Sequence, residues 1–172
     1  MTRRRFAALA AGLGMATSLA VAGPLVAAKG GGGKASAKPA SKALFHAVLN
    51  GRNEVDQAGK KNAGDKDAQG AAVVTVKGTT VCFGVVAQSL GSVAAAHIHA
   101  GKKGVNGGVV FDLTPTAGPG DTFAFSACKP AGTLDVAALK RNPERFYVNI
   151  HTDEFGGGAI RGQLRRLSVN QG

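Results

Sequence analysis

From Leu44 onward, apolar residues occur in short runs that are rich in valine, alanine and threonine and are separated by glycine. Such runs are typical of short strands joined by turns. Two of them, Ala71–Val76 and Thr80–Val86, flank Lys77-Gly78-Thr79 and predict a β-hairpin. We expect the other strands at Leu44–Leu49, Ala94–Ala100, Gly108–Leu113, Asp121–Ala127, Phe146–Thr152 and Ala159–Val169.

One helical segment interrupts this pattern. Leu134–Arg141 carries apolar residues at helical spacing, and Asn142-Pro143 ends it. The residues from Asn50 to Gln69 are mostly polar and are expected to form a loop. About eight strands with turns at regular spacing predict an all-β domain, either a Greek-key-like β-sandwich or an open barrel.

The first 43 residues differ in composition from the rest. Arginines at positions 3–5 precede an uncharged stretch that reaches Ala28, as in an export signal peptide, with Val26-Ala27-Ala28 as a cleavage point. The start also resembles the twin-arginine motif, so general Sec export and twin-arginine export both stay open, and an uncleaved membrane anchor is the alternative. Residues 29–43 contain mainly Gly, Ala, Lys and Ser and predict a flexible linker. The β-domain is therefore expected over residues 44–172.

The chain has a formal charge of +11, but this charge is unevenly distributed. Arginines 3–5 and four lysines of the linker precede Leu44, whereas all ten acidic residues follow it. The remaining excess of about four positive charges is ordinary for a domain of this size. Aromatic and basic residues also do not interleave, so we expect no nucleic-acid partner.

Cys82 and Cys128 are the only two cysteines. In an exported chain a lone pair of this kind is expected to form a disulfide, and two free thiols or a redox pair are the alternatives. The absence of a C-x-x-C spacing argues against the redox pair. An exported chain with this pair is expected in an oxidising location, either secreted or in the cell envelope.

Three stretches are more specific than composition. They are FHAVLNGRNEV from Phe45, AAHIHAG from Ala95 with GVNGGVV from Gly104, and FYVNIHTDEFGGGAIRGQL from Phe146. Together they resemble the CHRD domain, a module first described in chordin, over about residues 44–167. The resemblance implies an extracellular β-domain without an established activity, and it does not imply growth-factor antagonism.

Histidine is the residue type that suggests chemistry. On a strand over Ala94–Ala100, His97 and His99 point to the same face because side chains alternate with period two. Two imidazoles at this spacing can bind one copper or zinc ion, with His151 as the natural third ligand and His46 as a possible fourth. Carboxylates of Asp112, Asp153 or Glu154 are candidates to orient an imidazole. The alternative is structural: His97 and His99 pin the loop Gly101–Gly107, and His151 packs at a sheet edge.

Copper–zinc superoxide dismutase also combines a secreted β-sandwich with a disulfide and an His-x-His strand. Its two-metal site uses six histidines, whereas this chain has four, so only a single-copper redox centre is conceivable. No nucleophile elbow or phosphate-binding loop occurs in the sequence. Arg161 stands among apolar neighbours and is expected to form a structural ion pair with Asp112 or Asp153, with an anion-binding role as the alternative.

Two hypotheses remain for the function. The first is a non-catalytic structural or binding module of the envelope or extracellular space, which recognises an extracytoplasmic protein or a surface ligand and meets the membrane only during export or through an uncleaved signal. The second is a copper- or zinc-binding protein that uses His97, His99 and His151, with or without redox activity.

Overall fold

A computed structural model describes residues 42–114 and 122–168. The predicted export segment, residues 1–28, and nearly all of the predicted linker lie outside these residues. Ala43, the last residue of the predicted linker, is already the first residue of a strand. Within the described residues, no helix is long and apolar enough to cross a membrane.

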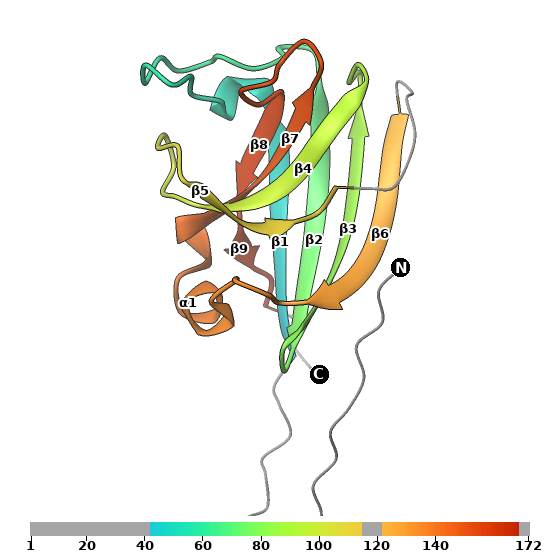
Figure 1. Cartoon of the computed structure of the whole chain (residues 1–172), viewed down its shortest axis with the longest axis vertical. Helices are drawn as coiled ribbons and strands as arrows, with labels where there is room; N and C mark the ends of the chain where they lie inside the picture. Colours follow the sequence, from blue (N-terminus) through green and yellow to red (C-terminus); the bar gives the residue numbers. More distant parts are fainter. Residues whose placement is uncertain (1–41, 115–121, 169–172) are drawn as a thin grey trace, which may run out of the picture. The chain divides into compact units, whose positions relative to one another are not determined.

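The domain is built around a single antiparallel sheet (Figure 1). Its strands are β1 (Ala43–Asn50), β2 (Gln69–Lys77), β3 (Thr80–Gln88), β4 (Val93–Ala100), β5 (Gly108–Asp112), β6 (Thr122–Pro130), β7 (Phe146–Thr152), β8 (Ile160–Gln163) and β9 (Arg165–Arg166). The helical elements are two 3-10 turns, η1 (Gly51–Asn53) and η2 (Pro143–Arg145), and the short helix α1 (Val136–Arg141). The predicted strands and the helical segment are therefore present, with small shifts at their ends.

The strand order is β5-β4-β7-β8-β1-β2-β3-β6, and β9 pairs with β1 beside this path. Neighbours such as β4 and β7 are not consecutive in the chain, which fits a Greek-key-like arrangement. The sheet curls so that its two edge strands meet at one point, where Lys129 Nζ of β6 lies 2.9 Å from Asp112 Oδ2 of β5. Of the two predicted architectures, the half-closed sheet matches the open barrel.

Period-two alternation directs one face of the sheet into the core. Phe45, Ala47 and Leu49 of β1 are buried, whereas Val48 between them is 67% exposed. The predicted hairpin is present, with β2 and β3 joined by Gly78 and Thr79. Gly78 has a φ of +59°, a left-handed conformation that glycine adopts without steric cost.

The predicted last strand, Ala159–Val169, is divided into β8 and β9 at Leu164. β8 pairs with both β7 and β1, whereas Arg165 and Arg166 pair with His46 and Phe45 of β1. Between them Leu164 is fully buried, and its amide donates to the carbonyl of Phe146 on β7. Leu164 thus stays bonded to β7 while its side chain packs in the core.

Cys82 and Cys128 form the predicted disulfide. The two residues are direct partners in the pairing of β3 with β6, so the bond joins the edge strand β6 to its only neighbour in the sheet. Cys128 is exposed and Cys82 is half-buried, which places the bond on the solvent side of the sheet. The bond implies an oxidising, extracytoplasmic location.

Arg161 has a different ionic partner from the two that the sequence suggested. Its Nε lies 3.6 Å from Glu54 Oε2, and both side chains are almost fully buried. Asp112 instead pairs with Lys129 on the far edge of the sheet, and Asp153 is exposed. Local sequence could not reveal this pair, because Arg161 opposes Asn50 at the end of β1 and so lies beside the segment that carries Glu54.

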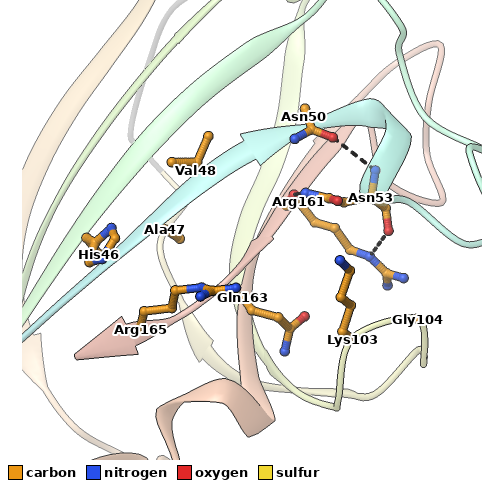
Figure 2. A pocket seen from close by; sticks show the side chains of 10 residues that line it. All are labelled: His46, Ala47, Val48, Asn50, Asn53, Lys103, Gly104, Arg161, Gln163 and Arg165. Atoms are coloured by element: carbon orange, nitrogen blue, oxygen red, sulfur yellow. Dashed lines mark hydrogen bonds between the residues drawn. The ribbon is translucent and has the colours of Figure 1, made fainter. Parts of the chain in front are cut away.

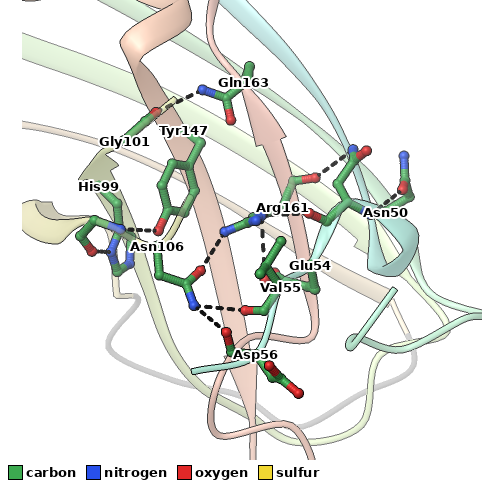
Figure 3. Close-up of polar contacts among 12 residues, drawn as sticks. Asn50, Glu54, Val55, Asp56, His99, Gly101, Asn106, Tyr147, Arg161 and Gln163 are labelled. Carbon is green, nitrogen blue, oxygen red and sulfur yellow. Dashed lines mark hydrogen bonds and ion pairs between the residues drawn. The ribbon is translucent and has the colours of Figure 1, made fainter. Parts of the chain in front are cut away.

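Arg161 also ties two loops to the sheet (Figure 3). Its Nε donates to the carbonyl of Asn53 at 2.7 Å, and its Nη1 donates to Asn106 Oδ1 at 2.8 Å. The amide of Asn106 in turn donates to the carbonyls of Val55 and Asp56. Together these bonds close the segment after β1 and the loop after β4 over the outer face of β7 and β8.

Glu54 is confined by the chain around it. Gly158 has a φ of +135°, and a Cβ atom there would stand 2.7 Å from Glu54 Oε2. Glycine is therefore required both by its backbone conformation and by the lack of space. Burial raises the pKa of the Glu54 carboxyl from its ordinary value of 4.5 to about 7, although the charge of Arg161 acts in the opposite direction.

Removal of the disulfide should lower stability without disturbing the core. Replacing both cysteines with alanine frees a loop whose ends are 46 residues apart, and we expect the free energy of unfolding to fall by about 4 kcal/mol at most. Urea unfolding of the wild type, oxidised and reduced, and of C82A/C128A measures this. The reduced wild type should match the variant, and no loss in either would contradict the prediction.

The raised pKa of Glu54 predicts an unusual dependence of stability on pH. The folded protein holds the Glu54 proton up to about pH 7, whereas the unfolded chain releases it near 4.5. Stability therefore falls as pH rises through this window, by up to about 3 kcal/mol for this group. We expect the wild type to lose stability relative to E54Q between pH 5 and 8 in urea unfolding. If the free energies of unfolding of the wild type and E54Q change in parallel with pH, the prediction is wrong.

Candidate functional site

The pairing of β4 with β7 gathers polar side chains on one face of the sheet. His97 opposes Asn149, His99 opposes Tyr147, and Ala95 opposes His151. Because opposed residues in a ladder share a face, all three histidines project to the same side, away from the core. The register of β4 against β5 shifts between Ile98 and His99, a β-bulge of the kind often found beside functional sites.

The three imidazoles predicted as metal ligands lie together. The ring centroid of His97 lies 5.6 Å from that of His99 and 5.3 Å from that of His151, and the centroids of His99 and His151 are 5.9 Å apart. One ring nitrogen from each histidine lies within 4.8 Å of the other two. Among the described residues, this is the one group of at least three His, Cys, Asp or Glu side chains with ligand atoms so close together.

Backbone carbonyls orient two of the rings. His99 Nδ1 lies 2.9 Å from the carbonyl of Gly107, and His151 Nδ1 lies 3.0 Å from that of Gly156. A carbonyl only accepts hydrogen bonds, so each Nδ1 carries a proton, and in the neutral form of the ring Nε2 is the nitrogen that can bind a metal ion. Among the ring nitrogens of the cluster, those that are buried and have no protein partner are these two Nε2 atoms and His97 Nδ1. Each ring thus has a buried nitrogen without a protein partner.

The surroundings keep two of these rings neutral. Burial lowers the pKa of His97, and the neighbouring His151 lowers it further, against an opposite effect of Asp112. Burial likewise lowers the pKa of His99, which the carbonyl of Gly107 partly offsets. A neutral imidazole is the form that binds a metal ion, so no proton needs to be displaced from these rings near neutral pH.

Tyr147 is a member of the site that the sequence analysis missed. Its ring stacks on His99 with centroids 4.9 Å apart and planes 9° from parallel. On the same ring lies the guanidinium of Arg161, 4.9 Å from its centroid, and the tyrosine hydroxyl accepts from the amide of Gly107. Tyr147 lies four residues before His151 on one strand, so period-two alternation could have placed it on the histidine face.

Of the other predicted contributors, Asp112 lies beside the cluster, because it opposes His97 in the pairing of β4 with β5. His46 is on β1, which β8 separates from β7, and it does not belong to the histidine cluster. The hydrogen bonds that orient His99 and His151 come from backbone carbonyls and not from Asp112, Asp153 or Glu154. Of the structural alternatives, the contact of His99 with the loop Gly101–Gly107 is present. His151 is not at a sheet edge, because β7 lies between β4 and β8.

The donor set fits copper or zinc. Imidazole nitrogen suits both ions, and a metal–nitrogen distance of about 2.1 Å places the nitrogens of a tetrahedral site about 3.4 Å apart. Nitrogens that already lie within 4.8 Å of one another reach that separation through small rotations of the rings. Three histidines leave one coordination position for water or another ligand.

Comparisons with known proteins identify the family. No curated protein and no solved structure matches the chain. The family model of the CHRD domain matches residues 45–164, which is well over half of the chain and contains all three clustered histidines. The CHRD domain is not a known enzyme family and suggests a non-catalytic module. The chain is therefore a member of the CHRD-domain family.

Proposed function

We propose that this protein is an exported, non-catalytic binding module that holds one copper or zinc ion through His97, His99 and His151. This proposal combines the two hypotheses drawn from the sequence, because a module of the envelope can act by binding a metal ion. The protein ligands would be His97 Nδ1, His99 Nε2 and His151 Nε2.

The single observation that carries the proposal is the set of three free, buried ring nitrogens. A buried polar atom without a partner costs free energy, and such atoms are rare in folded proteins. Three of them directed into one small region are explained together by one cation. The carbonyls of Gly107 and Gly156 hold two rings in the required tautomer, as outer partners of metal-binding histidines do.

Export supports the choice of metal. An imidazole site without thiolates suits Cu(II) or zinc, ions available outside the cytoplasm, and the only cysteines form the disulfide. When bound, such an ion would offer its open position to a ligand or to electron transfer. The residues of this chain supply binding and orientation.

Metal binding should stabilise the folded protein. For protein purified without metal, we expect the melting temperature to rise with Cu(II) or Zn(II) and to return with a chelator, because a ligand present at 100 times its Kd stabilises by about 2.7 kcal/mol. H97A/H99A should lose this rise. H46A is the matched control, since His46 lies outside the cluster, and it should keep the rise. An equal loss in both variants, or no rise at micromolar metal in the wild type, would refute the proposal.

The pH dependence of binding tests the neutral state of the rings. Because the pKa values of His97 and His99 lie below the usual 6.5, protons should compete with the metal only at lower pH than for ordinary imidazoles. Titration with Zn(II) at a fixed concentration between pH 5 and 8 should therefore give a half-loss of binding at lower pH than for a short peptide with three ordinary histidines and the same affinity at pH 8. A half-loss at the same or higher pH than for the peptide would show that the rings are not held neutral.

A further inference from the structure

A groove of about 430 Å³ lies on a part of the domain distinct from the histidine cluster (Figure 2). It runs beside β1, β8 and β9 and is closed on one side by the loop after β4. Its polar lining consists of basic and amide side chains from these elements, namely His46, Asn50, Asn53, Lys103, Gln163 and Arg165, with Arg161 at one end. No carboxylate lines this groove.

The cations of the groove are not neutralised by the protein. Within residues 42–114 and 122–168, the two ion pairs use Lys129 and Arg161. Lys103 and Arg165 are exposed, and neither forms an ion pair there. In Figure 2 their side chains lie on the two sides of Gln163. The positive charges of Lys103 and Arg165 are therefore exposed to solvent and available to an anion.

The positive surface continues beyond the groove. An adjoining hollow shares His46, Lys103, Gln163 and Arg165 with it and extends to Lys102, Arg145 and Arg166. The single carboxylate in its lining belongs to Glu144. Several cations thus follow one another along an open path, an arrangement that suits a polymer with repeated negative charges better than one small anion enclosed by converging donors.

The path is held in place by Gln163. Its Nε2 donates to the carbonyls of Gly101 and Glu144 at 2.9 and 2.7 Å, and to that of Phe146 at 3.3 Å. Gly101 directly precedes the two lysines of the loop, and Glu144 directly precedes Arg145. One amide group therefore fixes both basic segments against β8, which reduces the conformational entropy lost when an anion binds.

The groove also has apolar and amide surface beside its cations. Val48 is 67% exposed on β1, next to Ala47 and the ring of His46. A polyphosphate has no apolar face to cover such a surface, whereas the faces of a sugar ring pack on it. Amides such as Asn50 and Asn53 can hydrogen-bond to hydroxyl groups. These features favour a polysaccharide among the polyanions.

We propose that this groove binds an acidic polysaccharide through ion pairs of its carboxylate groups with Lys103 and Arg165. Val48 and the ring of His46 contact the sugar faces, and the hollow beyond receives the next acidic units. The surface does not depend on the histidine cluster, and its test is carried out with a chelator present.

The test measures binding of the purified protein to polygalacturonate, with dextran as a neutral polymer, and compares two double charge reversals. K103E/R165E changes the groove, whereas K61E/K77E makes the same change of net charge at exposed lysines elsewhere. All proteins keep the same N-terminus, so the lysines before Leu44 contribute equally. We expect the wild type to bind polygalacturonate but not dextran, K103E/R165E to bind at least tenfold more weakly, and K61E/K77E to change less than twofold.

Two results would overturn the proposal. An equal loss of affinity in the two variants would mean that net charge alone attracts the polymer. Binding of polyphosphate or single-stranded DNA as tight as that of polygalacturonate would mean that the groove recognises charge without sugar. Melting curves of both variants, expected to match that of the wild type because all four positions are exposed, exclude misfolding as the cause.

Discussion

The buried guanidinium of Arg161 organises the polar side of this domain. A charge removed from water is stable only when other polar groups replace its hydration. Its partners are the carbonyl of Asn53, the amide oxygen of Asn106 and the carboxyl of Glu54, which all belong to the two segments that cover the sheet. The need to satisfy one cation thus fixes both segments over β7 and β8 and keeps Tyr147 nearly inaccessible beneath them.

This cover sets the chemistry of the histidine face. β7 is buried on both sides, with Val148 and Ile150 in the core and Tyr147 and Asn149 under the loops. Imidazoles at the border of such a dry surface lose hydration in their charged form, which is why burial leads the causes that lower the pKa of His97 and His99. The neutral imidazoles of His97 and His99 therefore result from the packing around them and not from an intrinsic property of these two residues.

Sequence reasoning succeeded where a pattern is local. Strands, the hairpin at Gly78 and the shared face of His97 and His99 all follow from alternation and turn chemistry, and the disulfide follows from a lone cysteine pair in an exported chain. The prediction of the ionic partner of Arg161 was wrong because this contact is not local in the sequence. Alternation tells which face a side chain takes but not which strands become neighbours, and Glu54 meets Arg161 only through the distant pairing of β1 with β8.

The basic groove illustrates the same limit for charge. A count of charged residues along the sequence assigns most of the positive excess to the N-terminal residues. The net charge that remains for the domain is ordinary. The fold nevertheless brings lysines of the loop after β4 beside arginines of η2 and β9, segments that are far apart in the chain. A modest net charge can therefore form a concentrated patch when the acids lie elsewhere, as Asp56, Asp65 and Asp67 do around a separate hollow.

One rung of the sheet connects the two surfaces. Tyr147 and Gln163 are opposed residues of β7 and β8: the tyrosine stacks on His99, and the glutamine fixes the basic segments. The surfaces nevertheless require opposite states of charge, since a metal site needs neutral imidazoles and a polyanion site needs cations. Arg161 belongs to both surfaces, because its positive charge adds a small contribution to burial, the main cause that lowers the pKa of His99, while it also lies at the end of the groove. The same cation therefore favours a neutral ligand on one side and an anion on the other.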